Sequence, residues 1–195
     1  MRPIVLLLLL IALPAWADSP LRVAVAANFR QVLEQINAGF TASTGQSVVL
    51  SSASTGVLYS QIIHGAPFDV FFAADQATPA LLADAPATPF CYARGSLVLT
   101  GGNGNLQDLA NGELSLAIAN PTTAPYGRAA SEILARPEFS AAQGRKLVRG
   151  SNVVQAYQFW HSGGADLALV PRALAPTAPL VPAAWHQPIE QHAIA

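Results

Sequence analysis

The sequence contains almost no cysteine and no cluster of basic residues. Cys91 is the single cysteine among 195 residues, so no disulfide can form within the chain and the fold must depend on core burial. Ten Lys and Arg residues against eleven Asp and Glu residues give a formal net charge of −1. A nucleic-acid surface needs a basic patch, which this sequence lacks. We therefore expect no nucleic-acid partner.

The sequence also lacks the motifs of common catalytic and metal sites. It contains no G-x-S-x-G elbow, no P-loop and no H-E-x-x-H pair among its four histidines. Asp69 and Asp75 flank one predicted strand, and a carboxylate pair can do acid–base work, but their spacing does not favour it. We expect no catalytic residue, no metal ligand and no cofactor, and hence a protein that is not an enzyme.

The N-terminus has the pattern of a secretory signal peptide. Arg2 precedes ten consecutive apolar residues, 4–13, and Ala15-Trp16-Ala17 is an A-x-A cleavage site. The apolar run is short for a membrane span. Removal of residues 1–17 leaves 178 residues with a formal charge of −2. The sequence therefore predicts an exported, periplasmic protein.

Strand-like and helix-like segments alternate along the rest of the chain, which favours an α/β fold with mostly parallel sheets and flanking helices. A Pro-rich passage at 78–89 and a second at 176–185 predict crossings between two lobes. We assign 18–80 with the return segment 181–195 to the first lobe and 81–180 to the second, with a ligand cleft between them. The predicted strands and helices are 21–28, 47–51, 68–74, 95–101, 113–120, 146–150 and 165–171, and 29–40, 57–65, 125–135 and 152–163.

Four predicted strands are each followed by small or polar residues and then by a helix start. Ligands of open α/β sheets bind beyond the carboxyl ends of the strands. Helix starts expose unpaired N–H groups and the positive end of the helix dipole, so they suit anions, although Asn, Ser and Thr also serve there as plain helix caps. The junctions are Ala27-Asn28, Ser54-Thr55-Gly56, Pro125-Tyr126-Gly127 and Ser151-Asn152-Val153.

The residues around these junctions resemble the periplasmic molybdate-binding proteins of ABC transporters. The resemblance covers the mature chain and lies in five segments in the same order: VAVAANF, FTASTGQSVVLSSASTGVLYSQIIHGAPFDVFFAADQ, YARGSLVL, LAIANPTTAPYGRAA and LVRGSNVVQAYQFWHSGGADLALV. It implies a two-lobed periplasmic-binding-protein fold of type II. It also implies a monomer that binds molybdate or tungstate and delivers it to the permease of an ABC importer.

The resemblance further implies which residues hold the oxyanion. They are Asn28 and Thr55 in the first lobe, with Ser54 beside Thr55, and Tyr126 and Val153 in the second lobe, both through backbone N–H groups. Neutral donors of this kind need no counter-charge, and they reject a ligand that still carries a proton. A fully ionised tetrahedral anion therefore fits better than hydrogen phosphate. Sulfate, a periplasmic α/β enzyme and a weakly binding remnant remain as alternatives.

The chain departs from that family at two places. Pro171 stands where some members place a tyrosine hydroxyl on the ligand, and Tyr126 is a possible substitute. The resemblance also implies a helical segment beyond Ala195 that packs on the first lobe, so we expect a C-terminally truncated chain. A truncated first lobe would expose apolar surface, which marks a partner site or an aggregation liability.

Export should remove residues 1–17 and leave Asp18 as the first residue of the mature protein. Mass spectrometry of the protein from a periplasmic extract measures this directly. Periplasmic protein that retains Met1 to Ala17 would contradict the predicted signal peptide.

Overall fold

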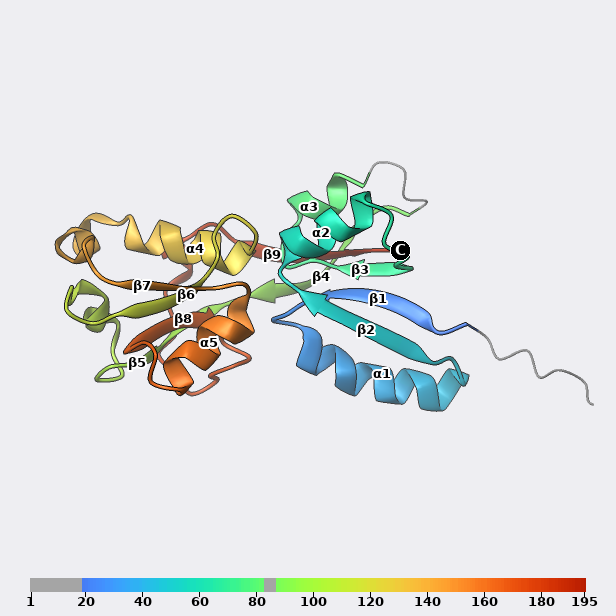
Figure 1. The fold of residues 1–195 in the computed structure, drawn as a ribbon, viewed down its shortest axis with the longest axis horizontal. Coiled ribbons are helices and arrows are strands. Elements are labelled where there is room, and N and C mark those ends of the chain that lie inside the picture. Colours follow the sequence, from blue (N-terminus) through green and yellow to red (C-terminus); the bar gives the residue numbers. More distant parts are fainter. Residues whose placement is uncertain (1–18, 83–86) are drawn as a thin grey trace, which may run out of the picture.

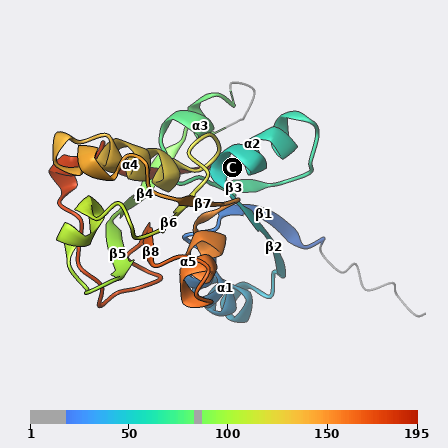
Figure 2. The same ribbon diagram turned by 60° about the vertical axis from the view of Figure 1, so that its left-hand side comes forward.

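The computed structural model describes residues 19–82 and 87–195, and it shows two lobes lying side by side (Figure 1). Each lobe contains one β-sheet with helices packed against it. Helices α2, α3 and α4 lie on one side of the two sheets, and α1 and α5 lie on the other (Figure 2). The predicted fold class, an α/β protein with two lobes, is confirmed. The predicted signal peptide lies outside the described residues.

The first lobe is built on a five-stranded sheet in the order β2-β1-β3-β9-β4. Strand β1 pairs in parallel with β2 and β3, whereas β9 runs antiparallel to both β3 and β4. The strand predicted at 68–74 is β3, which lies at the centre of this sheet. The elements of this lobe are β1 (Leu21–Ala26), α1 (Arg30–Thr44), β2 (Val48–Ala53), α2 (Thr55–Ile63), β3 (Val70–Phe72), α3 (Ala77–Ala80), β4 (Phe90–Gly95) and β9 (Ile189–Ile194).

The second lobe is built on a four-stranded sheet in the order β5-β8-β6-β7. Strand β6 pairs in parallel with β7 and β8, and β5 runs antiparallel to β8. Strands β6 and β8 are buried along their whole length, as expected for strands covered on both faces. The elements are β5 (Leu97–Gly101), η1 (Leu106–Ala110), β6 (Leu116–Ala119), α4 (Pro125–Leu134), η2 (Pro137–Ala142), β7 (Leu147–Gly150), α5 (Val153–His161), β8 (Leu167–Pro171) and η3 (Ala183–Trp185).

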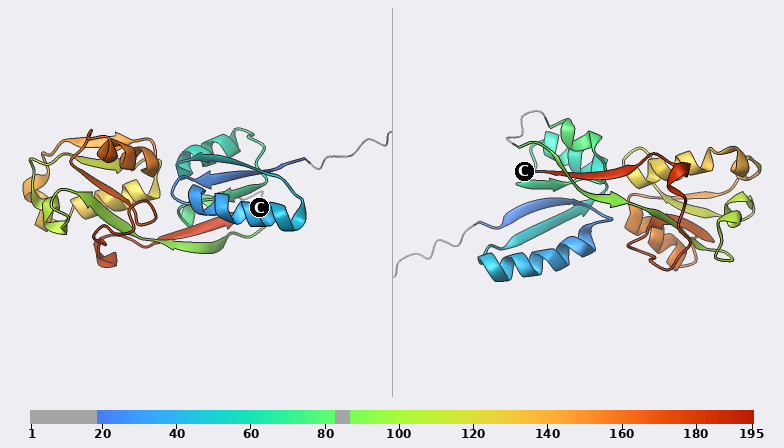
Figure 3. Two further views of the ribbon diagram at one scale, coloured as in Figure 1. Left: turned by 90° about the horizontal axis from the view of Figure 1, so that it is seen from below. Right: turned by 180° about the vertical axis from the view of Figure 1, so that it is seen from behind.

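Two strands that the sequence did not predict, β4 and β9, connect the lobes, and we call them the interlobe strands (Figure 3). They pair with each other and belong to the first sheet, so the lobe boundaries differ from those expected. The chain enters the second lobe after Gly95 and not near residue 80, because β4 still bonds to β9. The return also comes later than residue 181, because the Val181 N–H donates to the Leu97 carbonyl in the second lobe.

Helix α1 leaves much of its apolar face exposed. Apolar residues recur at helical spacing along it, but only Leu33 is buried, and Ile36 and Phe40 are 54% and 41% exposed. These side chains border an apolar groove of about 190 Å³ between α1 and the strands β1 to β3. The apolar surface expected on the first lobe is therefore present, on the α1 side of the sheet.

The groove should bind a hydrophobic dye in the native protein. The double substitution Ile36→Gln and Phe40→Gln should lower the dye fluorescence and leave the melting temperature nearly unchanged, because exposed substitutions change stability by about 0.5 kcal/mol or less. Ile63→Gln is the matched control, since Ile63 is 55% exposed on α2 and does not line the groove. A native protein that binds no dye would contradict this assignment.

Candidate functional site

The starts of three helices from both lobes meet in one pocket at the interface of the lobes. Helix α2 begins after β2, α4 after β6 and α5 after β7, so each helix starts beyond the carboxyl end of a parallel strand. All four expected residues line this pocket, together with Ser54. The full lining is Ala26, Ala27, Asn28, Ser54, Thr55, Ala74, Ala124, Pro125, Tyr126, Asn152 and Val153.

The pocket is small and its side chains are uncharged. Its volume of about 10 Å³ corresponds to the space that one water molecule requires. No aspartate, glutamate, lysine, arginine or histidine is among the residues that line it in the described structure. Each helix start carries about half a positive elementary charge, so the three starts together place roughly 1.5 positive elementary charges at the pocket. The pocket is therefore electropositive without a basic side chain.

The start of α5 offers one backbone donor. Asn152 caps the helix, and its side-chain oxygen accepts hydrogen bonds from the N–H groups of Val154 and Gln155 at 2.9 and 3.1 Å. The helix N–H groups then pair internally from Ala156 onward. The N–H of Val153 has no acceptor in the described structure, so the cap leaves this donor for the pocket.

The start of α4 is uncapped. Ala124 precedes the helix and cannot cap it, and Pro125 at the first helical position has no N–H. The first helical hydrogen bond runs from the Arg128 N–H to the Ala124 carbonyl. The Tyr126 N–H consequently has no acceptor among the described residues. Neutral residues at this junction thus keep a backbone donor unpaired, where a serine or aspartate cap would bind it.

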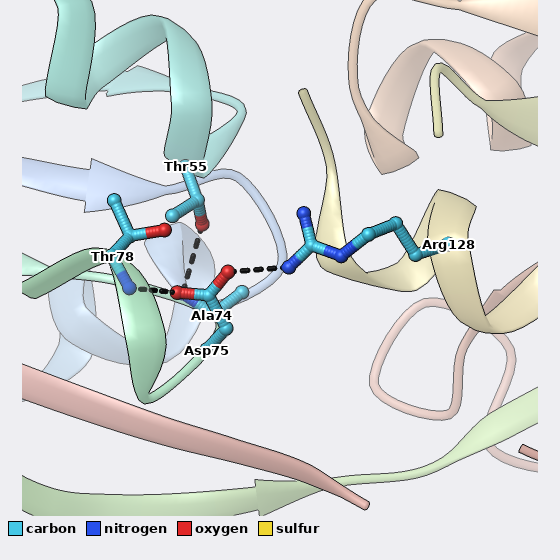
Figure 4. Close-up of polar contacts among 5 residues, drawn as sticks. All are labelled: Thr55, Ala74, Asp75, Thr78 and Arg128. Atoms are coloured by element: carbon cyan, nitrogen blue, oxygen red, sulfur yellow. Dashed lines mark hydrogen bonds and ion pairs between the residues drawn. The ribbon is translucent and has the colours of Figure 1, made fainter. Parts of the chain in front are cut away.

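The start of α2 offers two hydroxyl groups. Ser54 is 4% exposed, and its Oγ atom is buried without a hydrogen-bond partner in the described structure. The Oγ1 atom of Thr55 accepts a hydrogen bond from the Ala74 N–H at 2.9 Å (Figure 4). A hydroxyl that accepts one bond can still donate its own proton. Both hydroxyls are therefore available as hydrogen-bond donors to a ligand in the pocket.

The side chain of Asn28 is hydrogen-bonded to the interlobe strand β9. Its Nδ2 donates to the Oε1 of Gln191 at 2.6 Å, and the Gln191 Nε2 donates to the hydroxyl of Tyr126 at 3.4 Å. Tyr126 lines the pocket, but its hydroxyl faces Gln191. Burial raises the pKa of this hydroxyl above its ordinary value, so it remains protonated. The structure thus does not aim this hydroxyl at the pocket as a substitute for a tyrosine at Pro171.

Pro171 lines a separate cavity that lies next to the pocket. The cavity has a volume of about 340 Å³, and Asn28 and Tyr126 line both spaces. Pro171 ends β8 on this cavity and does not line the pocket. A proline offers no side-chain hydroxyl at this position.

Contacts between the lobes hold the pocket closed. Arg128 on α4 forms an ion pair with Asp75 at 2.5 Å, and the other carboxylate oxygen of Asp75 accepts from the Thr78 N–H (Figure 4). Arg128 is an exposed residue on the face of α4, so this ion pair with the facing lobe lies where solvent reaches it. A backbone bond from Gly56 to the Thr123 carbonyl joins the lobes next to the pocket. A Cβ at Gly56 would lie 3.1 Å from that carbonyl, which explains the glycine.

The residues that sequence reasoning missed are those that support the pocket. Gln191 lies in a strand that was not predicted, although the alternation of IEQHAI is the usual signal of a strand. The pairing of Asp75 with Arg128 spans 53 positions and has no local signal. Among residues 19–82 and 87–195, no helix is both long and apolar enough to cross a membrane, and no three potential metal ligands cluster.

Comparison with known proteins agrees with this geometry. The molybdate-binding protein ModA of Azotobacter vinelandii is 43% identical over 159 residues, which span 76% of this chain and 63% of that protein. ModA of Rhodobacter capsulatus is 35% identical over 198 residues, which span 94% of this chain and 78% of that protein. The match to the Azotobacter protein thus covers less than two thirds of its length.

Solved structures show the same architecture. The periplasmic molybdate-binding protein of Azotobacter vinelandii superposes with a TM-score of 0.80 at 39% identity and covers 89% of this chain and 84% of its own. The sulfate-binding protein SubI of Mycobacterium tuberculosis shares the fold, with a TM-score of 0.67 at 14% identity. The match covers 91% of this chain and 75% of SubI.

The family model of bacterial extracellular solute-binding proteins matches residues 21–194. The resemblance found in the sequence is thereby confirmed. With a helix-start pocket between two α/β lobes, this chain belongs to the family of bacterial extracellular solute-binding proteins.

Proposed function

We propose that this protein binds a tetrahedral oxyanion, molybdate or tungstate, in the periplasm and delivers it to an ABC importer. The ligand-binding groups are the side chains of Asn28, Ser54 and Thr55 and the backbone N–H groups of Tyr126 and Val153. The similarity to molybdate-binding proteins and the chemistry of the pocket both support this ligand. The strongest support is the buried hydroxyl of Ser54, which has no hydrogen-bond partner in the described structure. Buried polar atoms are normally hydrogen-bonded, so this hydroxyl indicates that a bound ligand supplies its partner.

Neutral donors suit a dianion at this position. A lysine or arginine in a closed pocket would have to be desolvated together with the ligand, and the gain would be largely offset. N–H and O–H groups fixed at helix starts need no such desolvation of a charge. A donor that faces a protonated ligand oxygen is left unpaired, which costs about 1–3 kcal/mol. The site therefore selects fully ionised anions over hydrogen phosphate.

The ligand must enter while the lobes are apart. The pocket holds about one water molecule in the described arrangement, and each lobe supplies part of the donors. A ligand that contacts both lobes binds the closed arrangement better and shifts the population toward it. We propose that the protein acts as a monomer whose closed form the importer permease recognises, and that binding is not followed by chemical turnover, since no acid–base pair lines the pocket.

Isothermal titration calorimetry of the mature protein tests this function. Molybdate and tungstate should bind with one site per chain, sulfate more weakly, and phosphate least at neutral pH. Absence of heat with all four anions would refute the proposal. Tight binding of sulfate alone would favour the alternative of a sulfate-binding protein.

The substitution Ser54→Ala should weaken molybdate binding about tenfold to a hundredfold, because a hydrogen bond to a charged group contributes roughly 1.5–3 kcal/mol. Its melting temperature without ligand should not fall, since the hydroxyl has no protein partner in the described structure. Thr55→Ala should weaken binding similarly and also lower stability, because the Ala74 N–H loses its acceptor. Ser60→Ala, at an exposed position of α2, is the matched control. Equal affinity of Ser54→Ala and the unchanged protein would exclude Ser54 from the site.

The substitution Arg128→Gln should favour the open arrangement of the lobes. The arginine is half exposed, so its ion pair with Asp75 contributes about 1 kcal/mol or less, and affinity should fall less than tenfold. Small-angle scattering should show a larger radius of gyration without ligand and recovery with saturating molybdate. Arg136→Gln is the control, since Arg136 pairs with Glu138 inside the second lobe. An identical radius for both variants would contradict a role of Arg128 in closure.

A further inference from the structure

Gln191 lies behind the pocket on the interlobe strand β9 and contacts a proposed ligand-binding residue of each lobe. Its Oε1 accepts from Asn28 of the first lobe at 2.6 Å, and its Nε2 donates to the Tyr126 hydroxyl of the second lobe at 3.4 Å. Gln191 is 4% exposed and does not line the pocket. It is therefore a buried polar residue between the two halves of the site.

Gln191 lies beside an aromatic cluster, and it also lines the neighbouring cavity together with Arg94 and Arg172. Tyr92, on the paired strand β4, lies within 3.1 Å of the Gln191 Oε1 and 2.9 Å of the Ala73 carbonyl. The ring of Tyr92 packs against Phe29 and Phe72, with centroids 4.7 and 5.2 Å away. Burial, with smaller contributions from Tyr126 and Cys91, raises the pKa of the Tyr92 hydroxyl above its usual range, so it remains a donor.

The chemistry of the amide explains why a glutamine is suited to this position. One amide offers an acceptor to Asn28 and a donor to Tyr126 at the same time. The bond to Asn28 lies within the first lobe and its adjoining strand, whereas the bond to Tyr126 joins that strand to the second lobe. At 3.4 Å the second bond is the longer one, and a movement of α4 away from β9 breaks it first.

Close packing at the same place makes the arrangement sensitive to lobe position. Gly95 on β4 faces the Tyr126 ring, and a Cβ there would collide with the tyrosine hydroxyl and lie 2.9 Å from Ile189. The Tyr126 side chain thus fits against the interlobe strands only without a side chain at Gly95. In this arrangement the Tyr126 hydroxyl therefore lies against β4 and within reach of Gln191.

We infer that Gln191 is a positioning residue that couples closure of the lobes to the orientation of Asn28 and Tyr126. It raises the affinity for the anion without contacting it. This inference rests on the proposed function, since it assigns Gln191 to the oxyanion site described above.

The test is a double-mutant cycle of molybdate affinities measured by calorimetry. Gln191→Leu keeps the side-chain size and removes both hydrogen bonds, so the dissociation constant should rise about tenfold. In the background of Asn28→Ala the same change should raise it by less than about threefold, because residues that act together are not additive. Gln143→Leu, at an exposed position of the second lobe, should leave affinity unchanged.

Two outcomes would overturn the inference. One is an unchanged dissociation constant in Gln191→Leu, even if its melting temperature falls, since that is the result of a purely structural role. The other is a full tenfold loss that persists in Asn28→Ala, since Gln191 would then act independently of Asn28. If Gln191→Leu does not fold, Gln191→Met makes the same deletion with an unbranched side chain.

A measurement without ligand separates this inference from the proposed function. If the unchanged protein binds none of the four anions, the proposed function fails, but spin labels at Ala42 and Ala141 in a Cys91→Ser background still report the distance between the lobes. Both label positions are exposed, one in each lobe. Gln191→Leu should lengthen and broaden the distance distribution. An identical distribution in both proteins would overturn the coupling by itself.

Discussion

The structure depends on backbone N–H groups that the helices α2, α4 and α5 cannot use internally. Every helix has such groups at its start, and most proteins pair them with a capping side chain or with water. Here the caps are incomplete in a selective way. Asn152 takes two donors of α5 and leaves that of Val153, whereas Ala124 and Pro125 leave α4 open. The helix starts of both lobes therefore present N–H groups without a protein acceptor in the described structure to the same pocket.

The two sheets bring these helix starts together. Parallel strands place all their carboxyl ends on one edge, so β2 and β6 with β7 each deliver a helix start to the interface of the lobes. The antiparallel strands have a different task. Strands β4 and β9 run between the lobes, and they hold Tyr92 and Gln191 directly behind the pocket. A change in the angle between the lobes therefore reaches the pocket through two hydrogen-bonded side chains.

Charged side chains lie at the edge of the lobe interface, and none lines the pocket in the described structure. Arg128 and Asp75 pair at the edge of the interface, where solvent weakens the interaction and allows it to break. The pocket itself offers helix dipoles and hydroxyls, which suit the proposed dianion without a permanent counter-charge. This separation fits the proposed carrier function, because a ligand bound by fully buried ion pairs would be costly to desolvate on entry and slow to release.

Much of the first sheet, the second sheet and the pocket follows from local sequence signals. Alternating apolar segments predicted β1, β2, β3 and β5 to β8 within a few residues, and small polar residues after them predicted the helix starts that line the pocket. These signals are local, because strand periodicity and helix capping involve residues within one turn or one strand. The family resemblance added the prediction that Asn28, Thr55, Tyr126 and Val153 lie at one site.

Only the tertiary structure decided how these parts are joined. The strands β4 and β9 were missed because their stability comes from pairing with each other across about a hundred residues. The stripe of α1 looked like a core face, but no described element covers Ile36 and Phe40. Arg128 is solvated as its sequence context indicates, but its pairing with Asp75 had no local signal. The sequence by itself thus determined the secondary elements and the donor groups at their ends, whereas long-range pairing determined which charges meet, which apolar faces are covered and what supports Asn28 from behind.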